Sequence, residues 1–287
     1  MTTLLVVQGS SRSQSKSGIT ECVRRIERYG WETTLISLSE YLDNTSSTAD
    51  FHSIAAVGGD GTVAAVIGQA ENTPVLVVPD GTGNDFARMI GIRSLSHSIQ
   101  VFREGVVTKC DIGKISHGEK SEYFVNGTGF GLDGVIAEKH ENGIPYSISV
   151  ATALFKLPIF SARICSDDLE IGEVTGDMKF VSLVIANGQY FGGGFRMAPE
   201  ANIDDGIFDV VLVKPVSSIK YAYSIIKVRR GTHLTDPSVK FWKCSKLEIL
   251  SDEEIPFHID GEFRSSNHIT IELLPLARKI YVANSVN

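Results

Sequence analysis

The sequence predicts an α/β fold in which a parallel-sheet N-terminal domain is followed by a β-rich, sandwich-like second domain. Two observations lead to this class. Strand-like and helix-like segments alternate before Val106, as they do in parallel sheets covered by helices. After Val106 most segments are strand-like and are joined by short turns. A chain of 287 residues has room for one large domain or two modest ones.

The predicted elements of the first domain follow one another closely. The buried strand "TLLVVQ" precedes a helix in "SGITECVRRIERYG", where the apolar residues have helical spacing and Gly30 is a plausible stop. The segments "WETTLISL", "SIAAV" and "PVLVV" are the next strands, and a helix from Thr62 lies between the last two. Ligands of parallel sheets bind beyond the carboxyl ends of the strands. The glycine-rich turns at Gly58 and Gly81 both follow such ends.

The second domain is predicted to consist mainly of strands, with two helices near Ile144–Leu157 and Ser217–Arg230. Its strand segments are "VTKCDIGKIS", "EYFVNGTGF", "KFVSLVIANG", "FDVVLV", "KFWKCSKLEILS", "EIPFHIDGEF" and "HITIELLP". We expect the last strand, "RKIYVAN", to return to the first domain. The predicted domains are therefore residues 1–108 with 276–287, and residues 109–275.

Composition argues against several classes of protein. The formal net charge of −7 gives no support for nucleic-acid binding. The four cysteines are far apart and show neither metal-knuckle nor redox spacing. The N-terminus resembles a first strand rather than a signal peptide, and no apolar run is long enough to span a membrane. We expect a cytoplasmic protein that could also lie at the inner face of the membrane.

The stretch "AAVGGDGTVAAVIGQ" joins a strand, a glycine turn and a helix N-terminus, which together form an anion site. Asp60 in this turn should repel phosphate. One explanation is that Asp60 caps the helix at Thr62, where the helix dipole favours negative charge. A cap alone leaves Gly58, Gly59 and Gly61 unexplained, so we favour a role in binding or chemistry.

The second turn, "PDGTGNDFAR", also follows a strand and opens a helix. Its two glycines permit a tight turn, Thr82 supplies a hydroxyl, and Asn84 or Asp85 could cap the helix. Alone it would be a well-capped loop, but two such turns on neighbouring strands favour a shared polyanion. Neither turn has the Walker A lysine. The phosphates would then need another counter-charge, most simply Mg²⁺.

Five motifs in series give the chain a resemblance to the diacylglycerol kinase catalytic-domain family, which includes soluble bacterial lipid kinases and sphingosine kinases. They are "GGDGT", "PDGTGNDFAR", "GTGFGLDG", "GGGFRMAPEANIDDGIFDV" and "IDGE". The resemblance covers nearly the whole chain. "GGDGT" alone is shared with NAD kinases, whereas the series is highly specific.

The resemblance implies an ATP- and Mg²⁺-dependent lipid kinase with ATP bound between two domains. Glu262 would be the general base on the lipid hydroxyl, with Asp60 nearby. Mg²⁺ would be held by the Asp205 carboxylate and by the backbone carbonyls of Asn202 and Ile207, although Asp-Gly is also a plain turn signal. The two turns and the loop after the first strand give these nucleotide-binding residues: Gln8, Gly9, Ser10, Ser11, Arg12, Gly58, Gly59, Gly61, Thr62, Gly81, Thr82, Gly83 and Asn84.

The sequence departs from the family pattern in three places. Ala64 and Ala65 stand where the family often has Asn-Glu, Gln8 and Gly9 stand where it often has Asn-Pro, and Asp80 replaces a usually apolar residue. The expected reaction is still transfer of the γ-phosphoryl group to a lipid alcohol, with diacylglycerol as the expected acceptor. An NAD kinase and a catalytically weak nucleotide- or lipid-binding regulator are the alternatives. A homodimer is left open.

Two further segments bear on the lipid. "IPYSISVATALFKLPIF" is either the lining of an acyl-chain pocket or a core helix, and the core helix is the simpler interpretation. "SSIKYAYSIIKVRRGTHL" mixes apolar and basic residues. It suits either a helix lying on anionic lipid or a solvated basic face.

Overall fold

The structure is a computed structural model that describes residues 3–9, 16–43, 48, 50–168 and 172–284. The chain divides into two compact units. Unit 1 comprises Met1–Ile112 and Leu276–Asn287, and unit 2 comprises Gly113–Pro275.

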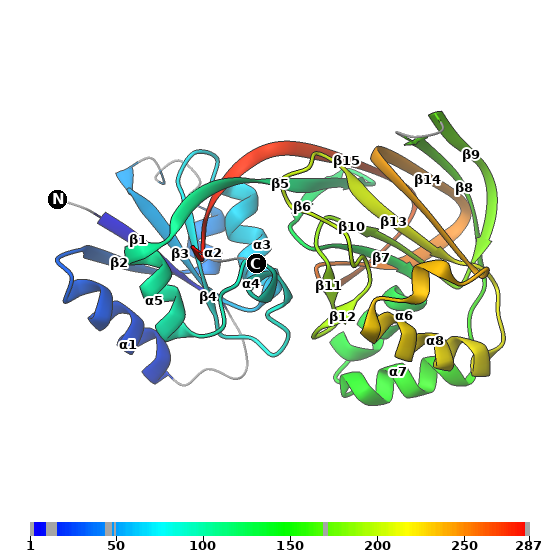
Figure 1. Ribbon diagram of the computed structural model, residues 1–287, viewed down its shortest axis with the longest axis horizontal. Coiled ribbons are helices and arrows are strands. Elements are labelled where there is room, and N and C mark those ends of the chain that lie inside the picture. Colours follow the sequence, from blue (N-terminus) through cyan, green and yellow to red (C-terminus); the bar gives the residue numbers. More distant parts are fainter. Residues whose placement is uncertain (1–2, 10–15, 44–47, 49, 169–171, 285–287) are drawn as a thin grey trace. The chain divides into compact units, whose positions relative to one another are not determined.

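Unit 1 is built on a parallel sheet with the strand order β4-β3-β1-β2, and the end of β15 pairs with β4 (Figure 1). The strands are β1 (Thr3–Gln8), β2 (Glu32–Ser37), β3 (Ser53–Gly58), β4 (Val75–Pro79) and β15 (Glu262–Val282). The central strands are continuous apolar runs because both of their faces are covered. The register pairs Gln8 with Val57 and Gly58 with Pro79. The carboxyl ends of β1, β3 and β4 therefore lie at one edge of the sheet.

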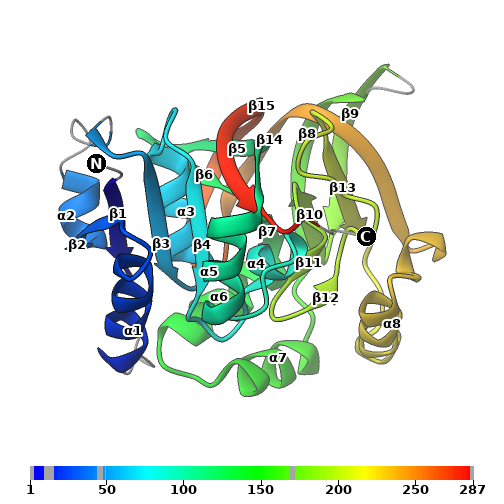
Figure 2. The same cartoon turned by 60° about the vertical axis from the view of Figure 1, so that its left-hand side comes forward.

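Helices cover both faces of this sheet (Figure 2). They are α1 (Lys16–Glu27), α2 (Leu38–Asp43), α3 (Asp60–Gln69), α4 (Asp85–Met89) and α5 (Leu95–Glu104). Helices α1 and α5 contact each other on one face, and α2 and α3 contact each other on the other. The predicted helical spacing of α1 is confirmed, because Ile19, Cys22 and Ile26 are buried. Gly30 follows α1 with a φ of 83°.

Strand β15 enters unit 1 at Leu276, which has a φ of 48°. The Leu276 N–H donates to the buried Asp111 carboxylate at 2.6 Å. Farther along the strand, the Arg278 guanidinium donates from Nε to the carbonyl of Ile67 (2.8 Å) and from Nη2 to that of Gly68 (2.6 Å). These carbonyls belong to the last turn of α3, where a cation is favoured. The C-terminal segment thus supports the helix that begins at Asp60.

Unit 2 consists mainly of antiparallel strands. Its strands, besides the last part of β5 (Val106–His117) and the first part of β15, are β6 (Lys120–Phe124), β7 (Gly127–Gly131), β8 (Phe160–Asp168), β9 (Gly172–Phe180), β10 (Ser182–Ala186), β11 (Tyr190–Phe191), β12 (Phe195–Arg196), β13 (Phe208–Val213) and β14 (Val239–Ile259). The long strand β14 pairs with β13, β8, β15 and β7 in different parts. Its register with β15 shifts between Leu250 and Ile255. Strand β14 thereby connects β7, β8, β13 and β15 around a shared core.

Aromatic rings fill much of that core. Phe130 stacks on Phe257 with ring centroids 5.1 Å apart, and Phe124 stacks on Phe208 at 5.5 Å. Offset stacking of buried rings adds to the free energy gained from their burial. The Phe130–Phe257 pair also joins β7 to β14, the two strands that lead to the glycine motifs of this unit.

Three helices complete unit 2: α6 (Leu132–Glu141), α7 (Tyr146–Phe155) and α8 (Ser218–Arg230). A single turn of 3₁₀ helix follows at His233–Thr235. Leu132 and Ile136 of α6 are buried with Ala153 of α7, and Tyr221 of α8 packs against this cluster. No helix in the described part of the chain combines the length and the apolar character needed to cross a bilayer.

The predicted fold class is confirmed, with local corrections. Helix α3 begins at Asp60 rather than Thr62. Strands β6 and β7 replace the single strand expected in "EYFVNGTGF". Helix α6 was not predicted, because Gly134 weakens the helical pattern. Glycine is needed there, since a Cβ would lie 2.2 Å from the backbone carbon of Pro256.

Candidate functional site

The two glycine-rich turns of unit 1 lie side by side at the carboxyl edge of the parallel sheet. The Gly9 N–H donates to the Val57 carbonyl at 3.0 Å, and the Asp80 N–H donates to the Gly58 carbonyl at 3.0 Å. Backbone hydrogen bonds thus continue past the ends of β1, β3 and β4. A ligand at this edge would meet three strand ends at once.

Thr62 explains two of the glycines. A Cβ on Gly9 would lie 2.1 Å from the Thr62 Oγ1, and a Cβ on Gly58 would lie 2.5 Å from the same atom. Both distances are far below a normal contact, so the Thr62 side chain occupies the space that only glycine leaves open. The turns also touch each other, because a Cβ on Gly81 would lie 2.5 Å from the Gly59 Cα.

The Asp60 carboxylate joins the two turns. Its Oδ2 accepts the Asp85 N–H at 3.0 Å, and its Oδ1 accepts the Phe86 N–H at 2.9 Å. These donors lie at the start of α4, where backbone N–H groups lack helical partners and negative charge is favoured. Asp60 therefore caps the helix of the second turn and not, as one sequence interpretation had it, its own helix at Thr62.

Asn84 has a different role from the predicted side-chain cap. It occupies the position before α4 with a φ of 51°, and its side chain makes no capping bond to that helix. Its Oδ1 accepts the Gly81 N–H at 3.0 Å, while its Nδ2 donates to the Gly81 carbonyl at 2.6 Å. Asn84 thus closes the "GTGN" turn on itself. Asp85 instead forms an ion pair with Arg88 at 2.5 Å.

The first turn of α3 is suited to an anion. Gly59 supplies no side-chain cap for that helix, so the early N–H groups of α3 are not capped by their own turn. Gly61 and Thr62 are half-buried and Thr82 is exposed. Burial raises the pKa of the nearby Asp80 carboxyl. The predicted residues Ser10, Ser11 and Arg12 lie outside the described residues.

In unit 2 the "IDGE" motif forms the turn between β14 and β15. Asp260 has a φ of 45° and Gly261 a φ of 97°. The Asp260 carboxylate accepts three consecutive backbone N–H groups: Val125 at 2.7 Å, Asn126 at 3.0 Å and Gly127 at 2.9 Å. Asp260 is a positioning residue that the sequence reasoning missed. The "IDGE" motif shows that Asp260 lies beside a glycine turn. It gives no sign of hydrogen-bond donors more than a hundred residues away in the sequence.

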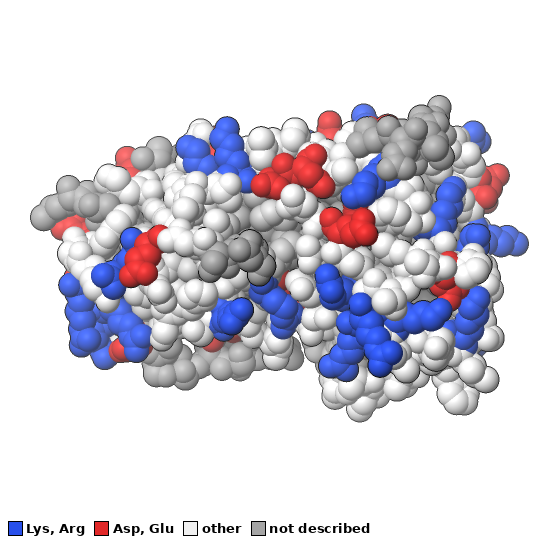
Figure 3. Space-filling model, in the orientation of Figure 1, with Lys and Arg blue, Asp and Glu red and all other residues white. Residues whose placement is uncertain are grey.

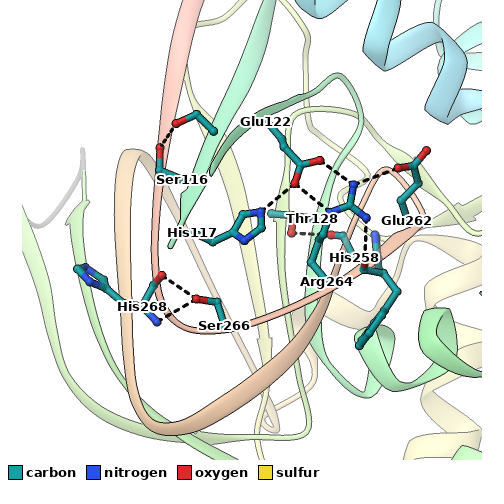
Figure 4. A network of polar contacts seen from close by, with 11 residues as sticks. Ser116, His117, Glu122, Thr128, His258, Glu262, Arg264, Ser266 and His268 are labelled. Carbon is teal, nitrogen blue, oxygen red and sulfur yellow. Dashed lines mark hydrogen bonds and ion pairs between the residues drawn. The ribbon is translucent and has the colours of Figure 1, made fainter. Parts of the chain in front are cut away.

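Glu262 projects from the same turn, and its side chain is 61% exposed. Arg264 Nη2 donates to Glu262 Oε2 at 3.2 Å (Figure 4). The same guanidinium binds Glu122 through Nε (2.9 Å) and Nη2 (2.7 Å), and His117 lies 2.8 Å from Glu122. Hydrogen bonds from Arg264 and His117 lower the pKa of Glu122 to about 2, although burial opposes them. Glu122 thus holds Arg264 where it can orient Glu262.

His258 stabilises the turn between β14 and β15. Its Nδ1 accepts the Gly261 N–H at 3.2 Å, and burial lowers the pKa of its imidazole to about 4. A neutral ring can accept this bond, whereas an imidazolium cannot. His258 is therefore a structural acceptor at neutral pH. The sequence contained no signal for it, because no ligand spacing surrounds it.

The loop expected to hold Mg²⁺ lies elsewhere in unit 2, just before β13. Asp205 is exposed, its Oδ1 accepts the Ile207 N–H at 3.3 Å, and Gly206 has a φ of 77°. The Asp-Gly turn is therefore confirmed. Among the described residues no group of three His, Cys, Asp or Glu side chains could hold a metal ion. One carboxylate with backbone carbonyls is nevertheless a donor set of oxygens, which fits a hard cation that keeps several waters.

The comparisons with known proteins cover both units. Residues 2–115 match the family model "Diacylglycerol kinase catalytic domain", and residues 136–282 match "YegS C-terminal NAD kinase beta sandwich-like domain". A diacylglycerol kinase of Bacillus subtilis (strain 168) is 25% identical over 95% of this chain and 92% of its own length. One of Staphylococcus saprophyticus is 28% identical over 88% of this chain and 86% of its own.

Solved structures share the fold. A crystal structure of a putative diacylglycerol kinase from Bacillus anthracis str. Sterne has a TM-score of 0.76 at 22% identity, covering 99% of this chain and 98% of that one. An NAD kinase from Archaeoglobus fulgidus in complex with ATP has a TM-score of 0.54 at 15% identity, covering 98% and 94%. At these identities the likeness concerns the fold alone.

We predict that Asp60→Asn lowers the free energy of unfolding by about 1–3 kcal/mol, because the NH₂ group that replaces one carboxylate oxygen cannot accept a hydrogen bond and leaves one of the two N–H groups unsatisfied. Chemical denaturation measures the change. Asp50→Asn, at an exposed aspartate of the same unit, is the control and should stay within about 0.5 kcal/mol of wild type. Equal stability of all three proteins would show that the two hydrogen bonds contribute nothing.

We predict that Glu122→Gln changes the acid stability of the protein. Because the pKa of Glu122 falls from 4.5 to about 2 on folding, its ionised form stabilises the native state fully above pH 4.5. That contribution is lost as the pH falls towards 2. Across this window the variant should lose less stability than wild type, while being less stable at neutral pH. Unfolding measured over a pH series tests this, with exposed Glu119→Gln as the control; a slope unchanged in Glu122→Gln would contradict it.

Proposed function

Because the chain belongs to the diacylglycerol kinase catalytic-domain family and is a lipid kinase of that type, we propose that it transfers the γ-phosphoryl group of ATP to a lipid alcohol, with diacylglycerol as the acceptor. The observation that carries the proposal is the pair of glycine-rich turns joined by Asp60 at the carboxyl edge of the unit 1 sheet. This arrangement gives backbone donors for phosphate without a Walker A lysine.

The glycine turns are the proposed nucleotide site. The early N–H groups of α3 and the positive end of its dipole would face the phosphates, and the Thr62 and Thr82 hydroxyls would add donors. Asp60 contributes by fixing the second turn against the first. Mg²⁺ is proposed at Asp205 with the backbone carbonyls of Asn202 and Ile207, a set of oxygen donors that suits a hard cation.

Glu262 is the proposed general base. In the reaction, the lipid hydroxyl oxygen forms a bond to the γ-phosphorus as the bond from that phosphorus to the bridging oxygen of ADP breaks. The hydroxyl proton passes to the Glu262 carboxylate. Support for this role comes from exposure and orientation: Glu262 is well exposed, and Arg264 contacts one oxygen of its carboxylate. Asp260 and His258 hold the turn that carries it.

We predict that label from γ-labelled ATP enters an organic-extractable lipid and that this transfer requires Mg²⁺. The assay offers diacylglycerol, other lipid alcohols in mixed micelles, and NAD, which is included because an NAD kinase shares the fold. Transfer to diacylglycerol exceeding transfer to all other acceptors supports the proposal. Transfer to NAD with none to any lipid would overturn it, and transfer to another lipid alcohol would replace diacylglycerol as the acceptor.

We predict that Glu262→Gln lowers kcat by roughly 10²–10⁴, the usual contribution of a positioned general base, and leaves ATP affinity nearly unchanged. The amide keeps the size of the side chain but cannot accept a proton at neutral pH. Exposed Glu253→Gln on β14 is the matched control and should behave as wild type. Normal turnover of Glu262→Gln, together with an inactive Asp60→Asn whose ATP affinity is unchanged, would make Asp60 the base.

A further inference from the structure

The described residues expose several large apolar side chains, and more than half of them lie on α7, on the segment after it, and on α8. We define the α7–α8 surface by the exposed residues Ile148, Phe155, Ile159, Ile219, Tyr223 and Ile226. Phe155 is 92% exposed and Ile219 85%, so these two side chains are almost fully in water. A gathered apolar surface of this kind marks an interaction site more often than do single scattered residues.

The packing of the two helices explains why these residues face outward. Helix α7 turns Ala153 into the core of unit 2, with Val150 and Leu154 packed against the same cluster. Helix α8 buries no residue completely, and only Tyr221 packs on that cluster. Ile219, Tyr223 and Ile226 recur at the spacing of one helical face. They therefore form an apolar stripe on the outside of α8.

The charge on α7, α8 and the residue after α7 is positive. Neither α7 nor α8 contains an aspartate or glutamate, whereas Lys156 follows α7 and Lys227, Arg229 and Arg230 lie in the last turn of α8. Figure 3 shows Lys and Arg side chains gathered over α8, beside the uncharged surface over α7. The chain as a whole carries a formal net charge of −7, so this cluster is opposite in sign to the rest of the protein.

Part of the positive charge has a structural partner. The buried Asp236 carboxylate lies 2.8 Å from the Lys227 Nζ and 3.5 Å from the Lys220 Nζ. This pairing fixes the end of α8 against the following 3₁₀ turn. The two arginines that follow are exposed, and Arg229 lies over the Phe195 ring at 5.9 Å. Cationic charge therefore remains on the solvent side of the helix.

We propose that the α7–α8 surface docks unit 2 onto an anionic lipid bilayer. Apolar side chains flanked by lysine and arginine suit the headgroup region, where the rings and aliphatic chains enter the acyl boundary and the cations meet lipid phosphate. A second copy of this chain fits less well. A symmetric interface would bring the same basic cluster of each copy towards the other.

The inference rests on the proposed function only in its choice of a lipid surface as the place where the acceptor is found. Docking itself needs neither ATP nor an acceptor. It is measured as binding of the full chain to vesicles of phosphatidylcholine with and without phosphatidylglycerol, by sedimentation in the absence of nucleotide. We expect binding to the anionic vesicles that weakens as salt is raised.

Two double variants separate the apolar contribution to vesicle binding from the electrostatic contribution. Phe155→Ser with Ile219→Ser should weaken binding to anionic vesicles by about tenfold or more, because two almost fully exposed apolar groups no longer enter the bilayer. Arg229→Gln with Arg230→Gln should weaken it by roughly thirtyfold at low salt. Each has a matched control at exposed positions elsewhere: Leu35→Ser with Val106→Ser, and Lys109→Gln with Lys120→Gln. Both controls should bind as wild type does.

Diacylglycerol phosphorylation in detergent micelles separates this inference from the proposed function. Variants that lose vesicle binding but keep wild-type turnover in micelles support the docking surface. Vesicle binding equal to wild type in both α7–α8 variants would overturn it. A dimer abolished by the serine substitutions, in a protein that does not bind vesicles, would assign the surface to a second copy instead. Wild-type vesicle binding with no lipid phosphorylation would remove the proposed function and leave the surface standing.

Discussion

Two hydrogen bonds to one carboxylate hold together the candidate nucleotide site of unit 1. Asp60 accepts the first N–H groups of α4 while its own backbone begins α3. The interaction requires the two turns to approach closely, and glycine at positions 59 and 81 permits this approach. Thr62 depends in turn on glycine at positions 9 and 58. The glycines, Asp60 and Thr62 thus pack together as one arrangement. Any contact with a nucleotide at this edge of the sheet depends on that arrangement.

Unit 2 uses the same device at its own glycine turn. Asp260 accepts three backbone N–H groups from the segment that leads from β6 into the start of β7, as Asp60 accepts two from the start of α4. In each case a carboxylate inside a turn satisfies donors that would otherwise lack partners. The backbone is thereby held in a conformation that glycine makes accessible. Asp60 and Asp260 both hold the backbone segments that they contact in place. The exposed acid at the turn between β14 and β15 is Glu262.

Sequence patterns predicted the framework of this protein better than its side-chain interactions. The strand–helix alternation before Val106 and the strand-rich remainder follow from hydrophobic periodicity, which depends on neighbours in sequence. Helix α6 escaped notice because Gly134 serves a close approach to β14 that no local pattern reveals. The Arg264–Glu122 pair joins residues 142 apart in the chain, so nothing in either segment alone pointed to the other. Motif resemblance named Asp60 and Glu262, but the partners of Asp60 required the tertiary structure.

The outer faces of α7 and α8 are the part of unit 2 that the fold itself does not explain. The core accounts for Ala153, Val150 and Leu154, which pack inward, and for Tyr221. The core does not require a particular residue at position 155, because the Phe155 side chain is 92% exposed. Substitutions at such surface positions usually change stability by only about 0.5 kcal/mol. Phenylalanine at position 155 therefore contributes little to folding and offers apolar area to water. Its physical explanation must be sought outside the folded chain, in whatever covers that area, and the cations beside it favour an anionic surface.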